Sequence, residues 1–254
     1  MNQSPAPLTI VAHRGASALA PENTMAAFSE ALDLGVDAIE ADVRATSDSD
    51  LVLFHDDNLA RLIGRPQKIA DLDRAALRQI VVGHDPTHGV QRIPSLNDLL
   101  RFAAGRACVL LDLKLPPEYD APILAAIRAA GAERATIIGV RSVASLRAFK
   151  DAAPEITTLA FGRTLDEVWA MAEAGADIVR LWSPWLDDAA LAQATRLGKP
   201  VWVMCGAPLR GEVGIASLPE LLDCRRRGVA GVILNDPRLA ALANAREASA
   251  SAIS

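Results

Sequence analysis

The chain has 254 residues, 51% of them hydrophobic, so it can bury a large core without disulfides. Its net charge of −5 argues against nucleic-acid binding and against stable attachment to an anionic membrane, because both need a broad basic surface. Three cysteines without CxxC spacing, and a polar segment 1–8 with no leader pattern, predict a protein of the reducing cytoplasm.

Short apolar runs rich in β-branched residues alternate with longer Ala/Leu/Glu/Arg-rich segments, which is the pattern of repeated βα units. Eight strands are predicted, at Leu8–Ala12, Ala38–Val43, Cys108–Leu113, Ala135–Val140, Thr157–Phe161, Ile178–Trp182, Pro200–Cys205 and Gly231–Leu234. Helices are predicted at Thr24–Leu34, Leu96–Ala104, Ala121–Ala130, Val143–Ala152, Leu165–Ala174, Asp187–Leu197 and Leu218–Arg227, with a short one after Pro237. This alternation favours a closed α/β barrel, the (β/α)8 or TIM barrel, over an open sheet.

One stretch breaks the βα rhythm. The segment between His55 and Pro94 is too long for a βα loop, and it contains a small predicted helix at Asp71–Ile80. Together with an extra strand at Leu51–Phe54 it indicates an insertion after the second strand, covering about residues 56–93. We expect residues 1–254 to form one barrel domain, with a frayed tail at 240–254.

Polar residues gather where the predicted strands end, which is where active sites form in a (β/α)8 barrel. They are His13 and Arg14 after the first strand, Glu40 and Asp42 in the second, His55 after the extra strand, and Asp112 and Lys114 at the third. Glu40 and Asp42 are two apart on a strand, so both face the barrel interior if their neighbours pack outward.

Two side-by-side carboxylates repel each other unless a cation or a proton lies between them. With Asp112 they form an all-oxygen set that suits Mg²⁺ or Ca²⁺ better than zinc. The alternative is an ion-paired interior in which Arg14 and Lys114 neutralise the acids.

His13 and His55 can supply a general acid and a general base near neutral pH. A lone histidine at a strand end is more often structural, but two that converge on an acidic cluster argue for a site. Arg14 and Lys114 can bind a phosphoryl oxygen.

The segment Pro21-Glu22-Asn23-Thr24 is expected mainly to cap the first helix through Asn23 or Thr24. A brace for the site from Glu22 and Asn23 is the second interpretation.

Taken in order, these segments resemble the glycerophosphodiester phosphodiesterase family. The matching motifs are His13-Arg14-Gly15, Pro21-Glu22-Asn23-Thr24, Gly35-x-Asp37-x-x-Glu40-x-Asp42-Val43, His55-Asp56, Ile93-Pro94-Ser95-Leu96, Asp112-x-Lys114, and Gly231-Val232-Ile233 with Pro237. The resemblance spans nearly the whole chain and is densest in its first half.

The resemblance implies a (β/α)8 barrel with a small insertion, and hydrolysis of a glycerophosphodiester to glycerol 3-phosphate and an alcohol in lipid and glycerol metabolism. It also implies a divalent cation on Glu40, Asp42 and Asp112. The implied catalytic histidines are His13 and His55, and the implied phosphate contacts are Arg14 and Lys114.

The chain departs from the family pattern at several positions. Asp112 stands where Glu is usual, which shortens the reach to a metal by about one bond length. Strand seven reads Trp202-Val203-Met204-Cys205 in place of Trp-Thr-Val-Asn, the turn after strand two reads Thr46-Ser47-Asp48-Ser49, and Asn235 replaces an expected acid. These changes bear on the substrate more than on the reaction type.

For the mechanism we expect His13 as the acid and His55 as the base, an order that the sequence does not fix. The tryptophans at 182, 185 and 202 either wall an alcohol pocket, where they would suit a quaternary ammonium, or pack in the core. His84 and His88 are expected to face solvent. The alternatives to the hydrolase are a lyase that forms a cyclic phosphate, a lysophospholipase D, and a non-catalytic phosphodiester-binding barrel.

Overall fold

Eight parallel strands close into a barrel in this structure, a computed structural model that describes residues 6–251. The strands are β1 (Thr9–Ala12), β2 (Ala38–Ala45), β6 (Cys108–Leu113), β7 (Thr136–Val140), β8 (Thr157–Ala160), β9 (Ile178–Trp182), β10 (Val201–Met204) and β11 (Gly231–Leu234). Each pairs with the next in this order, and β1 closes the ring by pairing with both β2 and β11. The predicted (β/α)8 barrel is confirmed.

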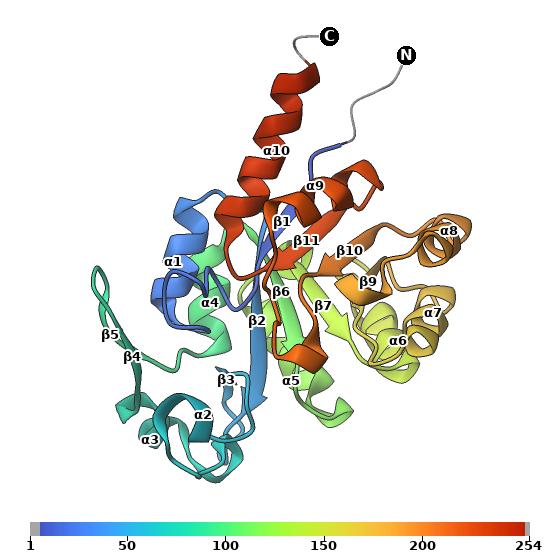
Figure 1. Cartoon of the computed structure of the whole chain (residues 1–254). Helices are drawn as coiled ribbons and strands as arrows, with labels where there is room; N and C mark the ends of the chain where they lie inside the picture. Colours follow the sequence, from blue (N-terminus) through green and yellow to red (C-terminus); the bar gives the residue numbers. More distant parts are fainter. Residues whose placement is uncertain (1–5, 252–254) are drawn as a thin grey trace.

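Helices follow the strands around the outside of the barrel (Figure 1). They are α1 (Met25–Asp33), α4 (Leu96–Ala103), α5 (Asp120–Ala129), α6 (Val143–Ala152), α7 (Leu165–Glu173), α8 (Asp188–Arg196), α9 (Leu218–Arg226) and α10 (Pro237–Ser251). Six of them begin after a Ser, Thr or Asp whose side chain accepts a hydrogen bond from the first turn, at positions 24, 95, 142, 164, 187 and 217. Short 3₁₀ turns lie at Pro117–Tyr119, Glu133–Ala135, Ser183–Trp185 and Pro208–Arg210.

Side-chain alternation divides the core into two layers. On β2, Ile39 and Val43 pack outward in the large cluster between strands and helices, so Glu40 and Asp42 face the barrel interior as predicted. The interior is apolar where Trp202 packs with neighbours such as Leu110 and Ile233. Trp202 is therefore a core residue, not part of a pocket wall.

The insertion leaves the barrel at the carboxyl end of β2. Strand β3 (Leu51–Leu53) pairs antiparallel with β2, and then follow α2 (Ala60–Ile63), a 3₁₀ turn at Ile69–Asp71, α3 (Arg74–Gln79) and the hairpin β4 (Val81–Asp85) and β5 (Gly89–Arg92). The hairpin was not predicted. It projects beside α1 (Figure 1), and its exposed His84 and His88 lie away from the acidic cluster, His88 bonded to Asp85.

The C-terminal helix runs through a segment that we expected to fray from residue 240. Its Ala240 and Ala243 are buried, and the Asn244 side chain makes two 2.9 Å hydrogen bonds to the backbone of Leu8. These contacts fix the helix to the start of β1, and the remaining residues 252–254 lie outside the described part. None of the helices described is long and apolar enough to cross a membrane.

Candidate active site

The turn after β1 is shaped by left-handed backbone. Arg14 and Gly15 have φ of 57° and 78°, and a Cβ on Gly15 would lie 2.7 Å from the Ala27 backbone. The sharp turn directs the Arg14 amide to Glu40 Oε2 at 2.8 Å. A glycine is therefore required after His13 and Arg14 because α1 passes so close.

The ring of His13 is held by Asn235, the residue after β11. Its Nδ1 lies 2.7 Å from Asn235 Oδ1, while Asn235 Nδ2 donates to the Val213 carbonyl at 2.9 Å. Because the amide NH₂ points to a carbonyl, Oδ1 must face the ring, so Nδ1 carries the proton and Nε2 a lone pair. Gly214 lies against this pair, where a Cβ would fall 1.9 Å from Asn235 Oδ1 and 2.7 Å from Nδ1.

Burial, reinforced by the Arg14 charge, lowers the pKa of His13 to about 4. The side chain is therefore neutral at pH 7, with Nε2 3.9 Å from Glu40 Oε2. A neutral imidazole with a free Nε2 can accept a proton.

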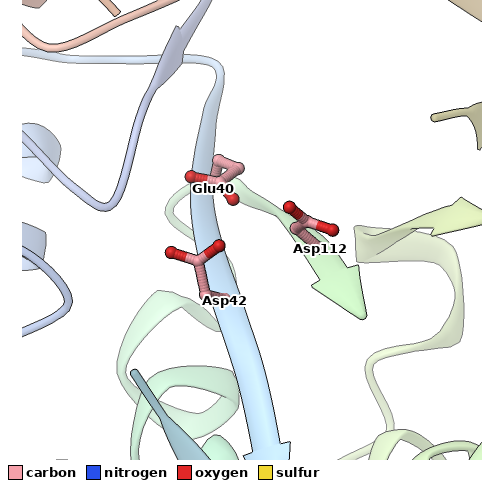
Figure 2. A group of neighbouring side chains, drawn as sticks. All are labelled: Glu40, Asp42 and Asp112. Carbon is pink, nitrogen blue, oxygen red and sulfur yellow. The ribbon is translucent and has the colours of Figure 1, made fainter. Parts of the chain in front are cut away.

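Glu40, Asp42 and Asp112 converge inside the barrel (Figure 2). Each offers an oxygen within 4.8 Å of the others, and all three are buried. Burial and the two aspartates raise the pKa of Glu40 well above its ordinary value. Among residues 6–251, no lysine or arginine side chain lies within ion-pair distance of Glu40, so the cluster is not fully neutralised by the protein.

Asp42 has the basic partners that Glu40 lacks. Arg14 Nε and Lys114 Nζ each lie 3.2 Å from one of its carboxylate oxygens. Although burial opposes it, these two charges lower the pKa of Asp42. Asn23 exchanges two hydrogen bonds with Asp42, while Thr24 caps α1, so the segment both caps the helix and braces the site.

Asp112 lies between two cations. Lys114 Nζ contacts one carboxylate oxygen, and Arg141 Nε donates to the other at 3.1 Å. These charges lower the pKa of Asp112 against the effect of its burial. The ion pairs of the alternative interpretation therefore exist, but they cover the two aspartates and leave Glu40 without one.

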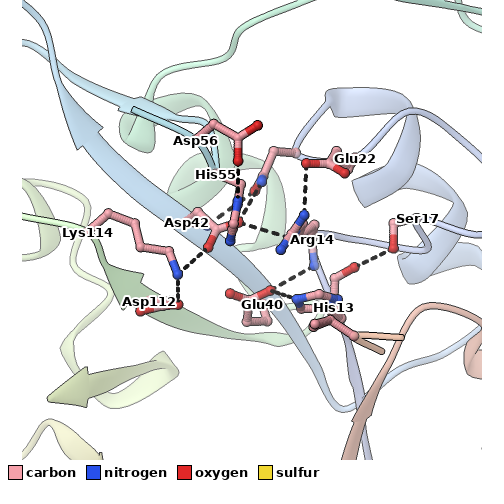
Figure 3. Close-up of polar contacts among 12 residues, drawn as sticks. His13, Arg14, Ser17, Glu22, Glu40, Asp42, His55, Asp56, Asp112 and Lys114 are labelled. Atoms are coloured by element: carbon pink, nitrogen blue, oxygen red, sulfur yellow. Dashed lines mark hydrogen bonds and ion pairs between the residues drawn. The ribbon is translucent and has the colours of Figure 1, made fainter. Parts of the chain in front are cut away.

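His55 reaches the same cavity from the strand after β2 (Figure 3). Its Nδ1 lies 2.7 Å from Asp56 Oδ1, and Arg44 donates two hydrogen bonds to its carbonyl. Burial alone would raise the pKa of Asp56, but hydrogen bonds from His55 and Arg61 lower it. Because a carboxylate only accepts hydrogen bonds, the His55 ring donates from Nδ1 to Asp56, and this contact orients the ring.

Arg61, in the insertion, connects this histidine to the first loop. It donates to Asp56 at 2.6 Å and to Glu22 at 2.6 and 3.0 Å, and Glu22 also accepts from Arg14 at 3.0 Å. The chain of contacts positions the two halves of the site relative to each other.

A family model, the glycerophosphoryl diester phosphodiesterase family, matches residues 13–196. The chain belongs to this family. A glycerophosphodiester phosphodiesterase of Caldanaerobacter subterraneus is 31% identical over 171 residues, which cover 64% of this chain and 70% of that protein. The protein YhdW of Bacillus subtilis is 37% identical over 110 residues, and this match spans less than half of YhdW, 45%.

The barrel also matches solved structures of the family. An Oleispira antarctica phosphodiesterase, solved in complex with the product sn-glycerol-3-phosphate, superposes with a TM-score of 0.76. It is 21% identical, and the superposition covers 92% of this chain and 96% of that one, so it shows a common fold.

In this family member all seven predicted site residues lie at one end of the barrel. Strands β1, β2, β3 and β6 bring these seven residues together, from His13 to Lys114. Three arginines that the motifs did not reveal line the same cavity, Arg141 after β7, Arg163 after β8 and Arg180 within β9. An arginine amid the apolar residues of β9, two before Trp182, was the available signal for Arg180.

Proposed function

We propose that the protein hydrolyses glycerophosphodiesters to glycerol 3-phosphate and an alcohol, in a reaction that depends on a divalent cation. The observation that carries the proposal is one cavity of about 340 Å³, lined by His13, Arg14, Asp42, His55, Asp112 and Lys114. Family membership and the product held by the Oleispira relative support it. Such an activity belongs to lipid and glycerol metabolism, in the cytoplasm that the sequence predicts.

The cation would be held by Glu40, Asp42 and Asp112. Three buried carboxylates form a donor set that fits a hard ion such as Mg²⁺ or Ca²⁺. One of them, Glu40, has no lysine or arginine of residues 6–251 within ion-pair distance. When bound, the ion supplies charge stabilisation to the phosphoryl oxygens and a lowered pKa to a coordinated hydroxyl.

Arg14 and Lys114 would bind the scissile phosphate. Both side chains border the cavity, and each lies between two acids. Arg14 lies between Glu22 and Asp42. Lys114 lies between Asp42 and Asp112. Their side chains are therefore fixed before the substrate arrives, which favours stabilisation of transition-state charge.

The hydrogen bonds favour His13 as the base and His55 as the acid, the reverse of our expectation from the sequence. Asn235 fixes the His13 tautomer with Nε2 unprotonated, ready to take a proton from a water or from the vicinal glycerol hydroxyl. Asp56 holds the His55 ring by its Nδ1 at the edge of the cavity, where His55 would give a proton to the oxygen of the departing alcohol.

The proposal is tested by measuring glycerol 3-phosphate released from glycerophosphocholine and glycerophosphoethanolamine. The assay is run with EDTA and with Mg²⁺ or Ca²⁺ added back, beside His13→Ala and the exposed control His88→Ala. Release that needs the metal and is lost only in His13→Ala supports the proposal. Equal release with EDTA contradicts the metal dependence. No release with any ion contradicts hydrolysis and leaves a phosphodiester-binding barrel.

Two alternatives are resolved by the products. A lyase would accumulate a cyclic phosphate, which phosphorus NMR distinguishes from glycerol 3-phosphate. A lysophospholipase D needs room for an acyl chain, and a cavity of about 910 Å³ with Trp185, Leu209 and Ile215 in its wall adjoins the site. Turnover of lysophosphatidylcholine faster than of glycerophosphocholine would favour that reading.

A further inference from the structure

Arg180 is a buried arginine that makes no ion pair with a carboxylate among residues 6–251. It lies within β9, is 2% exposed, and points into the barrel. One Nη donates to the Gly162 carbonyl at 2.9 Å, while Nε and the other Nη have no hydrogen-bond partner in the described part of the chain. Buried N–H groups of a charged side chain that lack an acceptor are costly and uncommon.

A second buried arginine shows what a structural role looks like in this fold. Arg225 on α9 is 4% exposed, and one of its Nη atoms donates to the carbonyls of Ala243 and Asn244 at 3.1 and 2.8 Å. That side chain holds α10 against α9. Arg180 borders the cavity of the proposed site, and the Nη that does not bond to Gly162 has no acceptor within the described residues.

Aromatic rings surround the Arg180 guanidinium. Its Cζ lies 4.3 Å from the ring centre of Phe161, 4.6 Å from that of Trp182 and 5.6 Å from that of Trp185. Burial lowers its pKa to about 9, so it stays charged at pH 7. The aromatic faces that would suit a quaternary ammonium are already occupied by a cation, which argues against the choline pocket considered from the sequence.

The cavity wall carries more positive than negative charge. The cations that line it are Arg14, Lys114, Arg141, Arg163 and Arg180, and the acids are Asp42 and Asp112. Arg14, Lys114 and Arg141 are paired with these acids or with Glu22. Within residues 6–251 the Arg163 side chain makes no ion pair, so Arg163 and Arg180 form an unbalanced cationic side.

The position of these two arginines identifies the part of the substrate that meets them. Arg163 and Trp182 line both the site cavity and the adjoining larger one, so they mark the passage between the two. The glycerol moiety is small, whereas the alcohol group varies in size and needs this extra room. A single phosphodiester carries one negative charge, which Arg14 and Lys114 suffice to bind.

We propose that Arg180, with Arg163 and Arg141, forms a second anion site, so that the preferred glycerophosphodiesters carry a further phosphate or carboxylate on the alcohol side. This proposal rests on the proposed function. An oxyanion there would accept the hydrogen bonds that Arg180 now lacks.

The test compares three substrates in one protein. Bis(glycerophospho)glycerol presents a second phosphodiester, glycerophosphoserine a carboxylate, and glycerophosphocholine a quaternary ammonium. We expect kcat/KM for at least one anionic substrate to exceed that for glycerophosphocholine by about 10- to 100-fold, the range for one desolvated charged hydrogen bond. The two anionic arms show whether phosphate or carboxylate is recognised.

The variants are Arg180→Met, Arg180→Lys and, as a control, Arg147→Met, which changes an exposed arginine on α6. Arg180→Met should bring the substrate ratio close to one, Arg180→Lys should restore part of it, and the control should leave it unchanged. A ratio taken within one protein does not depend on the fraction folded. A wild-type preference for glycerophosphocholine, or a ratio unaffected by Arg180→Met, would overturn the proposal.

Binding separates this proposal from the hydrolase itself. Calorimetry on His13→Ala and His13→Ala/Arg180→Met, with the same three compounds, measures affinity whether or not turnover occurs. Tighter binding of the anionic compounds that is lost with Arg180 supports the anion site even if no glycerol 3-phosphate is ever released. Equal affinities for all three compounds refute it even if hydrolysis is confirmed.

Discussion

The two sides of the barrel mouth are built differently. On the side of β1, β2 and β6, acids and bases are interlocked, with Arg14, Lys114 and Asn23 all in contact with Asp42. On the side of β8 and β9, Arg180 is packed among aromatic rings and has no acidic partner among the residues that the structure describes. On the proposed function, the first side carries out the reaction, and the second side determines which substrates bind.

The difference indicates which properties a substitution changes on each side. A change on the β1 and β2 side should lower turnover for every substrate, because it acts on the reacting groups. A change at Arg180 should alter the ratio between substrates. The comparison fails if either side shows the behaviour expected of the other.

The largest effect is expected from the histidines. His13→Ala should lower kcat by roughly 10²–10⁴-fold for all substrates alike, because it removes one proton-transfer group. Steady-state kinetics on the three diesters check this. A loss confined to one substrate would mean that His13 determines substrate selectivity and is not a proton-transfer group.

Replacing Glu40 should change both the pH dependence of stability and the stabilisation by metal. In the metal-free protein the folded pKa of Glu40 is raised above the ordinary 4.5, so the contribution of Glu40 to stability falls as pH rises above 4.5. Glu40→Gln should remove that loss, which is about 1 kcal/mol per pH unit for one group, and should also abolish the rise in Tm on adding Mg²⁺ or Ca²⁺. Thermal melts across pH with EDTA and with metal measure both. A variant that still gains Tm from metal would remove Glu40 from the ligand set.

The His13–Asn235 contact should set the acid limb of the pH profile. With a His13 pKa of about 4, activity should hold as pH falls and be lost only as the ring gains a proton near that value. Asn235→Asp places a carboxylate charge beside Nδ1 of His13. The pKa of His13 should therefore rise by roughly one or two units, and the acid limb of the profile should move to higher pH. Profiles of kcat/KM for both proteins decide. An unmoved limb would exclude His13 as the base.

The smallest effect is expected at the insertion. Arg61 is 45% exposed on its side chain, so Arg61→Ala should cost less than about 1 kcal/mol of stability. Because Arg61 orients Asp56 and Glu22, KM should rise a few-fold while kcat changes little. The neighbouring exposed Arg65→Ala is the control. A large fall in kcat would mean that the insertion takes part in the reaction.

Much of the barrel could be predicted because its signals are local. Buried parallel strands are marked by β-branched runs such as Ile178 and Val179, and six of the eight barrel helices begin after a capping residue such as Ser142. Strand alternation then placed Glu40 and Asp42 on the inner face. The hairpin at 81–92 was missed because its strands are short and mostly exposed or half-buried, with little apolar alternation.

Only those site residues that lie in recognisable sequence motifs could be predicted. The roles of the histidines depend on Asn235 and Asp56, whose hydrogen bonds form between distant or irregular segments and have no periodicity to detect. The tail at 240–251 was expected to fray from its Ala/Ser composition, yet small residues allow α10 to lie close against β1. Arg180 gave a signal only as a charge in an apolar strand.

The geometry of the site depends on Gly214, although this residue has no reactive group. It carries no functional group and lies 201 positions along the chain from His13, yet the space beside the imidazole exists only because this residue has no side chain. In a mutational scan, this loop position should score as intolerant as a catalytic one. A family-wide survey that weighs only acids, bases and ligands would pass over it.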